Sequence, residues 1–557
     1  MTRGLSLLPP APWPEGDAPP PVATLPELID WQAARRPEGE ALVAGDVRQD
    51  YAALSAGIRR VAAGLAALGV GRGSHVALLA PNRAEWILAA FGAHRVGAVL
   101  ESFNTWVKAW DLRHLLSASG AEVLITAPGV RGADLLGELR TLAPDLWETG
   151  RSAEFPALRT IVVLPGDAPT PAPPCAIRWE ELLAEGRGDV PAIASHADDV
   201  AYVLYTSGTT AAPKAVPLTH RRLIENGYSI GSRMGLTEAD RVWLGSPLFW
   251  SYGCANAAMS TFGHGATLVL QDRFTPQSAA AVFARERITA AYLLPSIAGA
   301  LHEDAAPEVR AVDSLRTGLI IGTPAEFTLA AVDLDIPELC NIYGSTESYG
   351  NCCVTPHTMP LDRRAVCQGP PLSLQGLRVA DMQTNEVLPF GEVGEIQVRG
   401  RILTEYIGNP EATVEAITPD GWFKSGDTGR LIEGGYVQFV GRATDMIKTN
   451  GINVSPAEVE SFLTTHPAVL EVGVVGAPHP TRGEATVAFV VLRDGAAATE
   501  EELIAFCKGT LAGFKVPWAV GFLDALPKTT TGKMMRRGLK DAAAGLVEER
   551  LCEGARS

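Results

Sequence analysis

The chain has 557 residues, of which 46% are apolar and 20% charged, and this is the composition of a globular protein with more than one core. The formal net charge of -16 argues against a nucleic-acid-binding surface, because phosphate backbones are bound mainly by basic residues. Any polyanionic ligand would need a local basic patch that overcomes the overall negative field.

Cysteine usage and the lack of long apolar runs are typical of a cytoplasmic protein. The eight cysteines form no Cys-x-x-Cys pair, and such sparse use fits a reducing environment better than a disulfide scaffold. Residues 1–21 are proline-rich and have too few consecutive apolar residues for a signal peptide. No apolar run approaches the roughly 20 residues of a membrane-spanning helix. We therefore expect a cytoplasmic protein with no membrane span and no nucleic-acid partner.

Short apolar strands alternate with helical segments in the first three fifths of the chain. The strands are expected at 74–81, 98–102, 121–126, 160–165, 201–205, 266–271, 289–295 and 314–321. Alternation of this kind predicts parallel sheets covered by helices on both faces.

The pattern changes after about residue 370. Segments 391–400 and 434–442 alternate apolar with polar residues and carry glycine turns, which predicts a small antiparallel barrel or sheet. Ser455-Pro-Ala-Glu458 is a capping box, so a helix should begin at residue 456. Two strands and a further helix are expected after it, at 469–476, 485–493 and from about 499. We place the domain boundary so that 1–441 forms an N-terminal domain and 442–557 a C-terminal domain.

The stretch TSGTTAAPKAV (206–216) follows an apolar strand and supplies hydroxyls, a glycine and one lysine, which are groups that bind phosphate oxygens. It is not the Walker phosphate loop, which requires Gly-x4-Gly-Lys-Ser/Thr, because from Gly208 the chain reads Gly-Thr-Thr-Ala-Ala-Pro-Lys-Ala. Taken alone, the stretch is explained equally well by a Ser/Thr-rich turn.

Four further segments carry polar residues at the ends of short apolar stretches. They are NIYGSTE (341–347), GWFKSGDTG (421–429), GRATDMIKTNGINVSPAEVE (441–460) and PKTTTGKMMRR (527–537). Each alone is explained by a solvated carboxylate, a turn residue, a surface charge or a basic tail. Together, and in this order, the five segments resemble those of the adenylate-forming superfamily, which contains acyl-CoA synthetases, peptide adenylation domains and luciferases. The resemblance extends over almost the whole chain.

This resemblance implies a two-step reaction. A carboxylic acid is joined to the α-phosphate of ATP with release of pyrophosphate, and a thiol, usually that of coenzyme A, then displaces AMP. The fold implied is α/β, with two doubly wound α/β subdomains and a small β-barrel in the large N-terminal region, followed by a small mobile α+β C-terminal domain.

The resemblance also assigns roles to residues of this chain. The residues implied to bind the nucleotide are Thr206, Ser207, Gly208, Thr209, Thr210, Lys214, Gly322, Thr323, Pro324, Tyr343, Gly344, Asp427 and Arg442. Those implied to be catalytic are Thr346, which faces the α-phosphate, Glu347, which binds Mg²⁺, and Lys533, which bridges the carboxylate and the α-phosphate. Asp427 is expected to bind the ribose hydroxyls, and Arg442 the ribose and phosphate.

The family's C-terminal domain rotates between the two half-reactions, and the pivot matches Thr444 and Asp445. Most relatives carry Asp or Lys where this chain has Thr444. Lys448 and Gly451 match the loop that lines the thiol tunnel and are expected to bind coenzyme A. The basic residues of this domain, Lys448, Lys533, Arg536 and Arg537, are expected to attract coenzyme A to an acidic protein.

The segment PLFWSYG (247–253) is expected to line the acyl pocket, with Phe249, Trp250, Tyr252 and Gly318 as its members. Plain aromatic core explains these side chains equally well. No acid lies near Phe249 and Trp250 to pair an α-amine, and only residues 534–557 follow Lys533, too few for a fused carrier domain. An apolar carboxylic acid and free coenzyme A are therefore the expected substrates.

The phosphate stretch departs from the family at two positions. Most relatives read Thr-Ser-Gly-Thr-Thr-Gly-x-Pro-Lys-Gly, so Ala211 and Ala215 replace two glycines. If the loop needs left-handed backbone there, each alanine costs about 1–2 kcal/mol. The substitutions predict a ligase that makes adenylates slowly and thioesterifies a preformed acyl-adenylate well; a loop that tolerates alanine is the competing interpretation.

Three alternatives to an ordinary ligase stay open. They are an enzyme that uses only preformed acyl-adenylate, an enzyme that loads a separate carrier protein, and a non-enzymatic sensor that binds an adenylate. The specific acid and the oligomeric state, for which a homodimer is one option, are not determined by the sequence.

Overall fold

The computed structural model describes residues 4–166, 170–186, 190–206, 213–442, 445–449, 452–454, 456–480, 482–508, 511, 513–528 and 534–554. The chain divides into two compact units. The larger unit comprises 8–377 and 398–423, and the smaller unit comprises 1–7, 378–397 and 424–557. The proposed domain boundary between residues 441 and 442 stays a prediction.

The larger unit contains a seven-stranded sheet. Its strands, in spatial order, are β10 (Ala176–Arg178), β9 (Thr160–Val163), β6 (Val123–Thr126), β4 (His75–Leu79), β5 (Val99–Ser102), β11 (Val200–Thr206) and β12 (Lys214–Thr219). Neighbours are parallel except at the edge, where β12 runs antiparallel to β11. The predicted strands of this region are confirmed, because each apolar run is buried within the sheet.

The larger unit also contains an eight-stranded sheet. Its strands, in spatial order, are β18 (Cys353–Val354), β17 (Glu338–Tyr343), β16 (Thr317–Ile320), β15 (Ala290–Leu293), β13 (Arg241–Leu244), β14 (Thr267–Leu270), β2 (Glu40–Ala44) and β3 (Val47–Asp50). The strands from β17 to β2 are parallel, and the two edge strands are antiparallel to their neighbours. The predicted pair of parallel sheets is thus confirmed.

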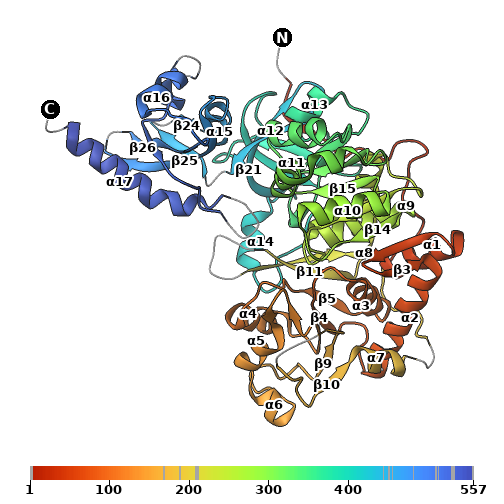
Figure 1. Ribbon diagram of the computed structural model, residues 1–557. Helices are drawn as coiled ribbons and strands as arrows, with labels where there is room; N and C mark the ends of the chain where they lie inside the picture. Colours follow the sequence, from red (N-terminus) through yellow and green to blue (C-terminus); the bar gives the residue numbers. More distant parts are fainter. Residues whose placement is uncertain are drawn as a thin grey trace. The chain divides into compact units, whose positions relative to one another are not determined.

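Helices pack around the sheets of the larger unit, and most of them lie between its strands in the sequence (Figure 1). They are α1 (Leu25–Arg35), α2 (Tyr51–Ala67), α3 (Ala84–Arg95), α4 (Ala109–Ser119), α5 (Leu135–Leu142), α6 (Asp145–Thr149), α7 (Trp179–Glu185), α8 (His220–Met234), α9 (Ala258–His264), α10 (Pro276–Glu286), α11 (Pro295–Arg310), α12 (Pro324–Thr328), α13 (Leu361–Val366) and α14 (Pro410–Ala416). Several begin at typical N-cap residues: Thr24, Asp50 and Thr275 each accept a hydrogen bond from a backbone N–H of the first turn.

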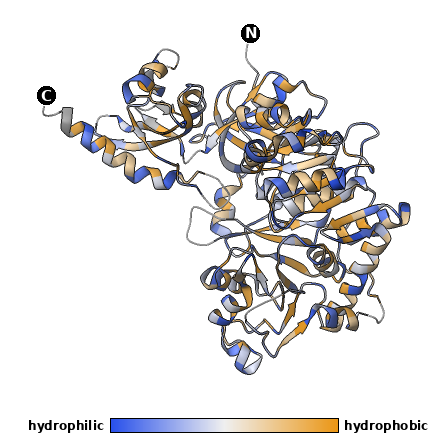
Figure 2. Cartoon of the chain, in the orientation of Figure 1, coloured by the Kyte–Doolittle hydropathy of each residue, from blue (hydrophilic) through white to orange (hydrophobic). Residues whose placement is uncertain are grey.

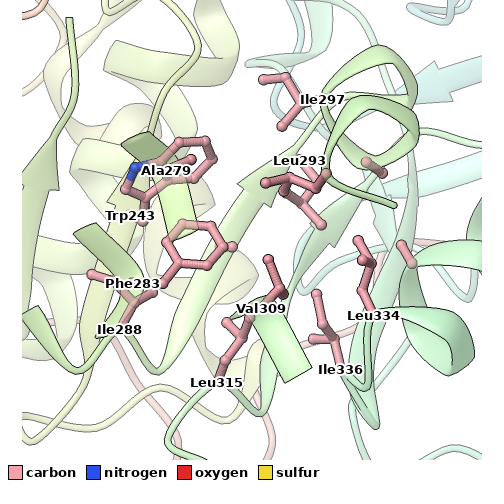
Figure 3. Close-up of a cluster of buried hydrophobic side chains, with 14 of the residues drawn as sticks. Trp243, Ala279, Phe283, Ile288, Leu293, Ile297, Val309, Leu315, Leu334 and Ile336 are labelled. Atoms are coloured by element: carbon pink, nitrogen blue, oxygen red, sulfur yellow. The ribbon is translucent and has the colours of Figure 1, made fainter. Parts of the chain in front are cut away.

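The core between the eight-stranded sheet and helices α10 and α11 is apolar and closely packed (Figure 3). Trp243 of β13 meets Phe283 of α10 edge to face, with ring centroids 5.0 Å apart. The indole N–H of Trp243 donates to Gln271 Oε1 over 2.8 Å, so the buried ring keeps its one polar atom paired. The strands are mostly hydrophobic along their length, whereas the helices carry hydrophilic residues on one side (Figure 2).

Two further five-stranded sheets include the strands of the smaller unit, and the boundary between the units runs through strands of the first. The first is β1 (Leu7–Leu8), β19 (Gly376–Ala380), β20 (Gly394–Arg399), β21 (Phe423–Ile432) and β22 (Tyr436–Arg442), in this order. Its predicted strands are confirmed, but its closure into a barrel is not: among the described strands, β1 and β22 are open edges. Closure requires hydrogen bonds between the first and last strands.

The second sheet of this unit has the order β24 (Ile452–Val454), β23 (Ile447–Thr449), β26 (Gly483–Leu492) and β25 (Val469–His479), and β27 (Ala519–Phe522) pairs with β26. Helices α15 (Pro456–Leu463), α16 (Glu500–Lys508) and α17 (Arg536–Gly554) accompany it. The predicted α+β C-terminal region is confirmed, including the helix start at residue 456. Ser455, the predicted cap, lies outside the described residues. No helix in the described ranges has the length and hydropathy needed to cross a bilayer.

Candidate active site

Strands β11 and β12 bring the two ends of the predicted phosphate loop together. Thr206 is the last residue of β11 and pairs with Lys214, the first residue of β12. The Thr206 hydroxyl donates to the Lys214 carbonyl over 3.4 Å. Between these ends, Ser207, Gly208, Thr209 and Thr210 lie outside the described residues, so their roles stay predictions.

Ala215 corrects one expectation about this loop. It lies within β12, pairs with Tyr205 and does not have a positive φ. Its carbonyl also accepts a hydrogen bond from the N–H of Ile407 over 3.0 Å. The expectation that Ala215 could need a left-handed backbone is therefore wrong. The backbone at this position is extended, and any L-residue adopts an extended conformation without strain. Ala211 lies outside the described residues.

The turn after β17 carries the predicted catalytic pair. Tyr343 ends the strand, and Gly344 follows where an added Cβ would lie 2.4 Å from the Gly350 carbonyl oxygen, so only glycine fits. Thr346 and Glu347 begin a short 3₁₀ helix, Thr346–Ser348. The Thr346 hydroxyl lies 3.2 Å from the hydroxyl of Ser251, which precedes the π-helix Tyr252–Ala257.

Glu347 and Lys214 both contact Tyr406. The Tyr406 hydroxyl donates to Glu347 Oε1 over 2.9 Å, and Lys214 Nζ lies 4.6 Å from the centre of the Tyr406 ring. Tyr406 is only 4% exposed, whereas Lys214 and Glu347 are half-buried. Burial, together with the charge of Glu347, raises the pKa of Tyr406 well above its usual range, so the phenol stays a neutral donor.

The donor set at Glu347 fits a hard divalent cation that is shared with a phosphate. Mg²⁺ is usually held by one or two carboxylates together with substrate phosphates, and it prefers oxygen ligands. Glu347 supplies one carboxylate, and its Oε1 is already oriented by a neutral hydroxyl. Among the described residues, no group of three or more His, Cys, Asp or Glu side chains forms an all-protein metal site.

Backbone packing and helix capping explain the predicted residues Gly318, in β16, and Thr323, after it. An added Cβ at Gly318 would lie 2.1 Å from the Ala291 carbonyl oxygen on the neighbouring strand. Thr323 caps α12: its hydroxyl accepts from the N–H of Glu326, and its own N–H donates to Glu326 Oε2 over 2.7 Å. Gly322 and Pro324 flank this cap. Contacts of these residues with a nucleotide or an acyl group stay predictions.

Three aromatic rings cluster beside the predicted acyl segment. Trp106 meets Phe249 and Trp250 with ring centroids 5.7 and 5.2 Å apart, and Phe249 meets Trp250 at 5.9 Å, all edge to face. The Tyr252 hydroxyl donates to the carbonyls of Leu293 and Leu319 at 3.0 Å each, so it ties the π-helix to the ends of β15 and β16.

A small, open hollow adjoins this aromatic cluster at the carboxyl ends of strands from both sheets of the larger unit. Its lining residues are Pro81, Asn82, Thr105, Trp106, Val130, Arg131, Gly245, Pro247, Phe249 and Asp272. The Asn82 amide donates to the backbone carbonyl of Ser246 over 2.9 Å and accepts from the N–H of Leu248 over 2.7 Å, which fixes the wall of the hollow. Its lining is partly apolar and aromatic, from Trp106, Phe249 and the two prolines, and partly polar, from Arg131 and Asp272 among others.

In the smaller unit, Asp427 of β21 faces Arg442 of β22 as a cross-strand pair. Arg442 Nε lies 2.8 Å from Asp427 Oδ1, and the side chain of Asp427 is 5% exposed while that of Arg442 is 50% exposed. The N–H of Asp427 donates to Ser425 Oγ over 3.1 Å, which fixes the start of the acidic side chain. A carboxylate and a guanidinium held side by side can recognise neighbouring hydroxyl and phosphate groups.

The predicted pivot is linked to helix α17. Arg536, the first residue of α17, contacts Asp445 over 3.3 Å and forms a two-pronged ion pair with Glu460 of α15 at 2.5 and 2.9 Å. Arg536 is thus paired with two carboxylates, and its expected contribution to attracting coenzyme A stays a prediction. Thr444, Gly451 and Lys533 lie outside the described residues, and of Lys448 only the backbone in β23 is described.

Two contact residues of this site had no assigned role in the sequence. Ser251 lies inside the segment 247–253 but carries no motif of its own, and Tyr406 follows a stretch with no motif and no periodicity. Their importance arises from tertiary proximity, since Tyr406 is 59 residues from Glu347 in the sequence. A partner for Glu347 could have been sought among tyrosines, but nothing in the sequence selects this one.

Comparisons with known proteins agree with the architecture. The model of the AMP-binding enzyme family matches residues 29–406, and that of the AMP-binding enzyme C-terminal domain matches residues 458–533. YngI of Bacillus subtilis is 32% identical over 538 residues, which cover 93% of this chain and 97% of YngI. The mitochondrial medium-chain acyl-CoA ligase ACSF2 of Rattus norvegicus is 30% identical over 545 residues, which cover 93% of this chain and 87% of that ligase.

A solved structure of an adenylate complex has a similar fold. The anthranilate CoA ligase AuaEII, in complex with anthranoyl-AMP, is 26% identical and matches with a TM-score of 0.81 over 94% of this chain and 98% of its own. The chain therefore belongs to the AMP-binding enzyme family, as an AMP-forming acyl-CoA ligase that works through an acyl-adenylate.

Proposed function

We propose that this ligase converts a predominantly apolar carboxylic acid into its coenzyme A thioester in two steps, adenylation followed by thioester formation. The observation that carries the proposal is the grouping of Lys214, Glu347 and Thr346 around Tyr406 and Ser251 in the larger unit. A cation for phosphate, a carboxylate for a metal ion and a hydroxyl are the parts that adenylation requires.

In the adenylation step, the chain's residues hold ATP while the acid attacks its α-phosphate. Thr206, Lys214 and the hydroxyls between them bind the β- and γ-phosphates, and Thr346 faces the α-phosphate. Glu347 holds Mg²⁺, which neutralises phosphate charge when it is bound. Lys533 bridges the acid and the α-phosphate, so that the negative charge of the transition state is shared with an ammonium group.

The smaller unit supplies the groups that keep the AMP moiety bound. Asp427 accepts hydrogen bonds from the ribose hydroxyls, and Arg442, fixed beside it, donates to ribose and phosphate. These contacts serve both half-reactions, because AMP leaves only when the thiol has attacked. Thr444 and Asp445 form the pivot that exchanges Lys533 for the thiol tunnel at Lys448 and Gly451.

The acyl group is proposed to lie against Phe249, Trp250, Tyr252 and Gly318. Support comes from the aromatic cluster that Phe249 and Trp250 form with Trp106. ACSF2 is named for medium-chain acids and AuaEII for anthranilate, and both acids have an apolar body. We place the protein in the cytoplasm because the seven cysteines whose side chains are described are all unpaired.

The adenylation step is proposed to be the slower one. This proposal now depends on Ala211 alone, because Ala215 lies in an extended strand. A methyl group at position 211 would hinder backbone N–H groups from approaching phosphate oxygens if glycine is required there.

The proposal is tested by screening carboxylic acids with ATP and Mg²⁺ against coenzyme A and, separately, against a phosphopantetheinyl carrier protein. We expect acid-dependent formation of AMP and thioester with coenzyme A. Thioester on the carrier protein alone would favour the loading enzyme. Binding of an acyl-adenylate without thioester on either acceptor would favour a sensor.

A further inference from the structure

Tyr406 belongs to none of the motifs that define the site, yet it contacts two of them. Its hydroxyl donates to Glu347 over 2.9 Å, and its ring lies 4.6 Å from Lys214 Nζ. The residue is 4% exposed, so both contacts are made by a nearly buried side chain. A ring in this place touches the lysine that follows the phosphate loop and the carboxylate that suits the metal ion.

The backbone around Tyr406 is fixed to the same two elements. On one side, the N–H of Leu403 donates to the Glu347 carbonyl over 2.7 Å. On the other, the N–H of Ile407 donates to the Ala215 carbonyl over 3.0 Å, next to Lys214. The N–H of Tyr406 itself donates to Thr413 Oγ1 of α14 over 2.9 Å. The segment 403–407 is thus a strap that spans the end of the phosphate loop and the catalytic turn.

The position of Tyr406 bears on whether Lys214 and Glu347 form an ion pair with each other. A lysine and a glutamate close to each other tend to form an ion pair, and such a pair would compete with phosphate for the lysine and with the metal ion for the carboxylate. In the described part of the chain, neither Lys214 nor Glu347 forms an ion pair. The glutamate instead accepts a hydrogen bond from a neutral phenol, and the ammonium rests on the face of the same ring.

We propose that Tyr406 is a positioning residue for adenylation: its hydroxyl orients Glu347 toward the metal ion, and its ring keeps Lys214 available for phosphate by separating the two charges. The inference rests on the proposed roles of Lys214 and Glu347 in binding ATP and its cation. Thioester formation from a preformed acyl-adenylate needs neither group, so Tyr406 serves only the first half-reaction.

Two substitutions separate the two contacts. Tyr406→Phe removes the hydroxyl and keeps the ring, whereas Tyr406→Leu removes both. For Tyr406→Phe we expect a weaker cation site, by about 10- to 100-fold, which is the value of one hydrogen bond to a charged group. Tyr406→Leu should show the same loss and, in addition, a raised KM for ATP, because Lys214 is then free to pair with Glu347.

The cation site is measured directly by electron paramagnetic resonance titration of Mn²⁺ in the presence of a non-hydrolysable ATP analogue. Pyrophosphate exchange as a function of Mg²⁺ concentration gives the kinetic counterpart. Coenzyme A thioester formation from synthetic acyl-adenylate, together with the thermal unfolding temperature, reports whether each variant is folded and competent in the second step. Tyr228→Phe is the matched control, because it removes a tyrosine hydroxyl that interacts with a carboxylate, that of Asp17, elsewhere in the larger unit.

Glu347→Gln makes the failure of this inference distinguishable from the failure of the proposed function. If Glu347→Gln leaves Mn²⁺ binding unchanged, the metal role of Glu347 is wrong and the proposed function must be revised. If Glu347→Gln weakens Mn²⁺ binding but Tyr406→Phe leaves it unchanged or strengthens it, the positioning role of Tyr406 is wrong. An equal loss of both half-reactions in Tyr406→Phe would also overturn the inference, because it would indicate a general structural role.

Discussion

The two alanines near the phosphate loop are not equivalent at the scale of single residues. Ala215 pairs within β12 in extended conformation, so its Cβ requires no backbone adjustment there. A glycine at this position is therefore not needed for conformation in this chain. The effect of the altered loop on ATP use must come from Ala211 or from neither alanine.

Reversion of each alanine should give different results. Ala211→Gly should raise the rate of pyrophosphate exchange, by up to about 30-fold if a left-handed backbone costing about 1–2 kcal/mol is relieved. Ala215→Gly should leave exchange unchanged and lower the thermal unfolding temperature slightly, because glycine weakens a strand interior. Exchange that rises only in Ala215→Gly would contradict this assignment.

At the scale of elements, the parallel sheets could be predicted because their strands are short apolar runs buried on both faces. β4, β5, β6, β9, β14, β15 and β16 all lie within their predicted ranges. The helix at residue 456 could also be predicted, since proline and a capping sequence mark its start. These features depend on local sequence alone.

Other elements depend on contacts that local sequence does not encode. The open edges of the sheet from β1 to β22 reflect which strands pair, and β1 is only two residues long. The role of Tyr406 likewise depends on a strap that returns to the catalytic turn from a distant part of the chain. The extended conformation of Ala215 follows from its pairing with β11, which overrides the expectation drawn from the family's glycine.

A titratable pair links the central strands that lead to the phosphate loop. His75 of β4 lies 2.7 Å from Glu101 of β5, and Tyr205 of β11 donates to the same carboxylate over 2.7 Å. The hydrogen bond to Glu101 raises the pKa of His75 above 6.5, and burial raises the pKa of Glu101 above 4.5. Both folded-state groups thus bind protons more tightly than the unfolded chain does.

The raised pKa of His75 determines how the stability of the protein changes with pH. The contribution of His75 is fully present below its unfolded pKa of 6.5 and is lost as pH rises through its raised folded pKa. We expect His75→Gln to reduce the fall in thermal unfolding temperature between about pH 6 and about pH 8. If the unfolding temperature changes with pH by the same amount in the natural protein and in His75→Gln, the His75–Glu101 pair does not contribute to the pH dependence of stability.

At the scale of the whole molecule, the polar groups fall into two sets on two compact units. Lys214, Thr346 and Glu347 lie in the larger unit, and the Asp427–Arg442 pair lies in the smaller one. Lys214 and Glu347 are proposed to be required only while pyrophosphate is present, whereas the Asp427–Arg442 pair and Thr346, which is proposed to face the α-phosphate, are proposed to be required until AMP leaves. The two half-reactions should therefore respond differently to substitution.

Lys533→Ala tests this division. The lysine is proposed to act only during adenylation, so its loss should slow pyrophosphate exchange by about 10- to 100-fold. Thioester formation from synthetic acyl-adenylate and coenzyme A should change far less. Asp427→Ala is the contrasting variant and should impair both steps. Equal damage to both steps in Lys533→Ala would show that the lysine is not specific to the first.

The central claim is that the protein makes an acyl-adenylate slowly and then converts it into a coenzyme A thioester. Its most direct test is a pair of rates measured on the natural protein with one carboxylic acid that the screen identifies as a substrate. The first is acid-dependent exchange of pyrophosphate into ATP without coenzyme A, and the second is coenzyme A thioester formation from the synthetic adenylate of the same acid. We predict that exchange occurs without coenzyme A but more slowly than the second reaction, and that the complete reaction releases AMP in equal amount to thioester. Cleavage of ATP to ADP, or thioester formation from the free acid without AMP, would contradict the account.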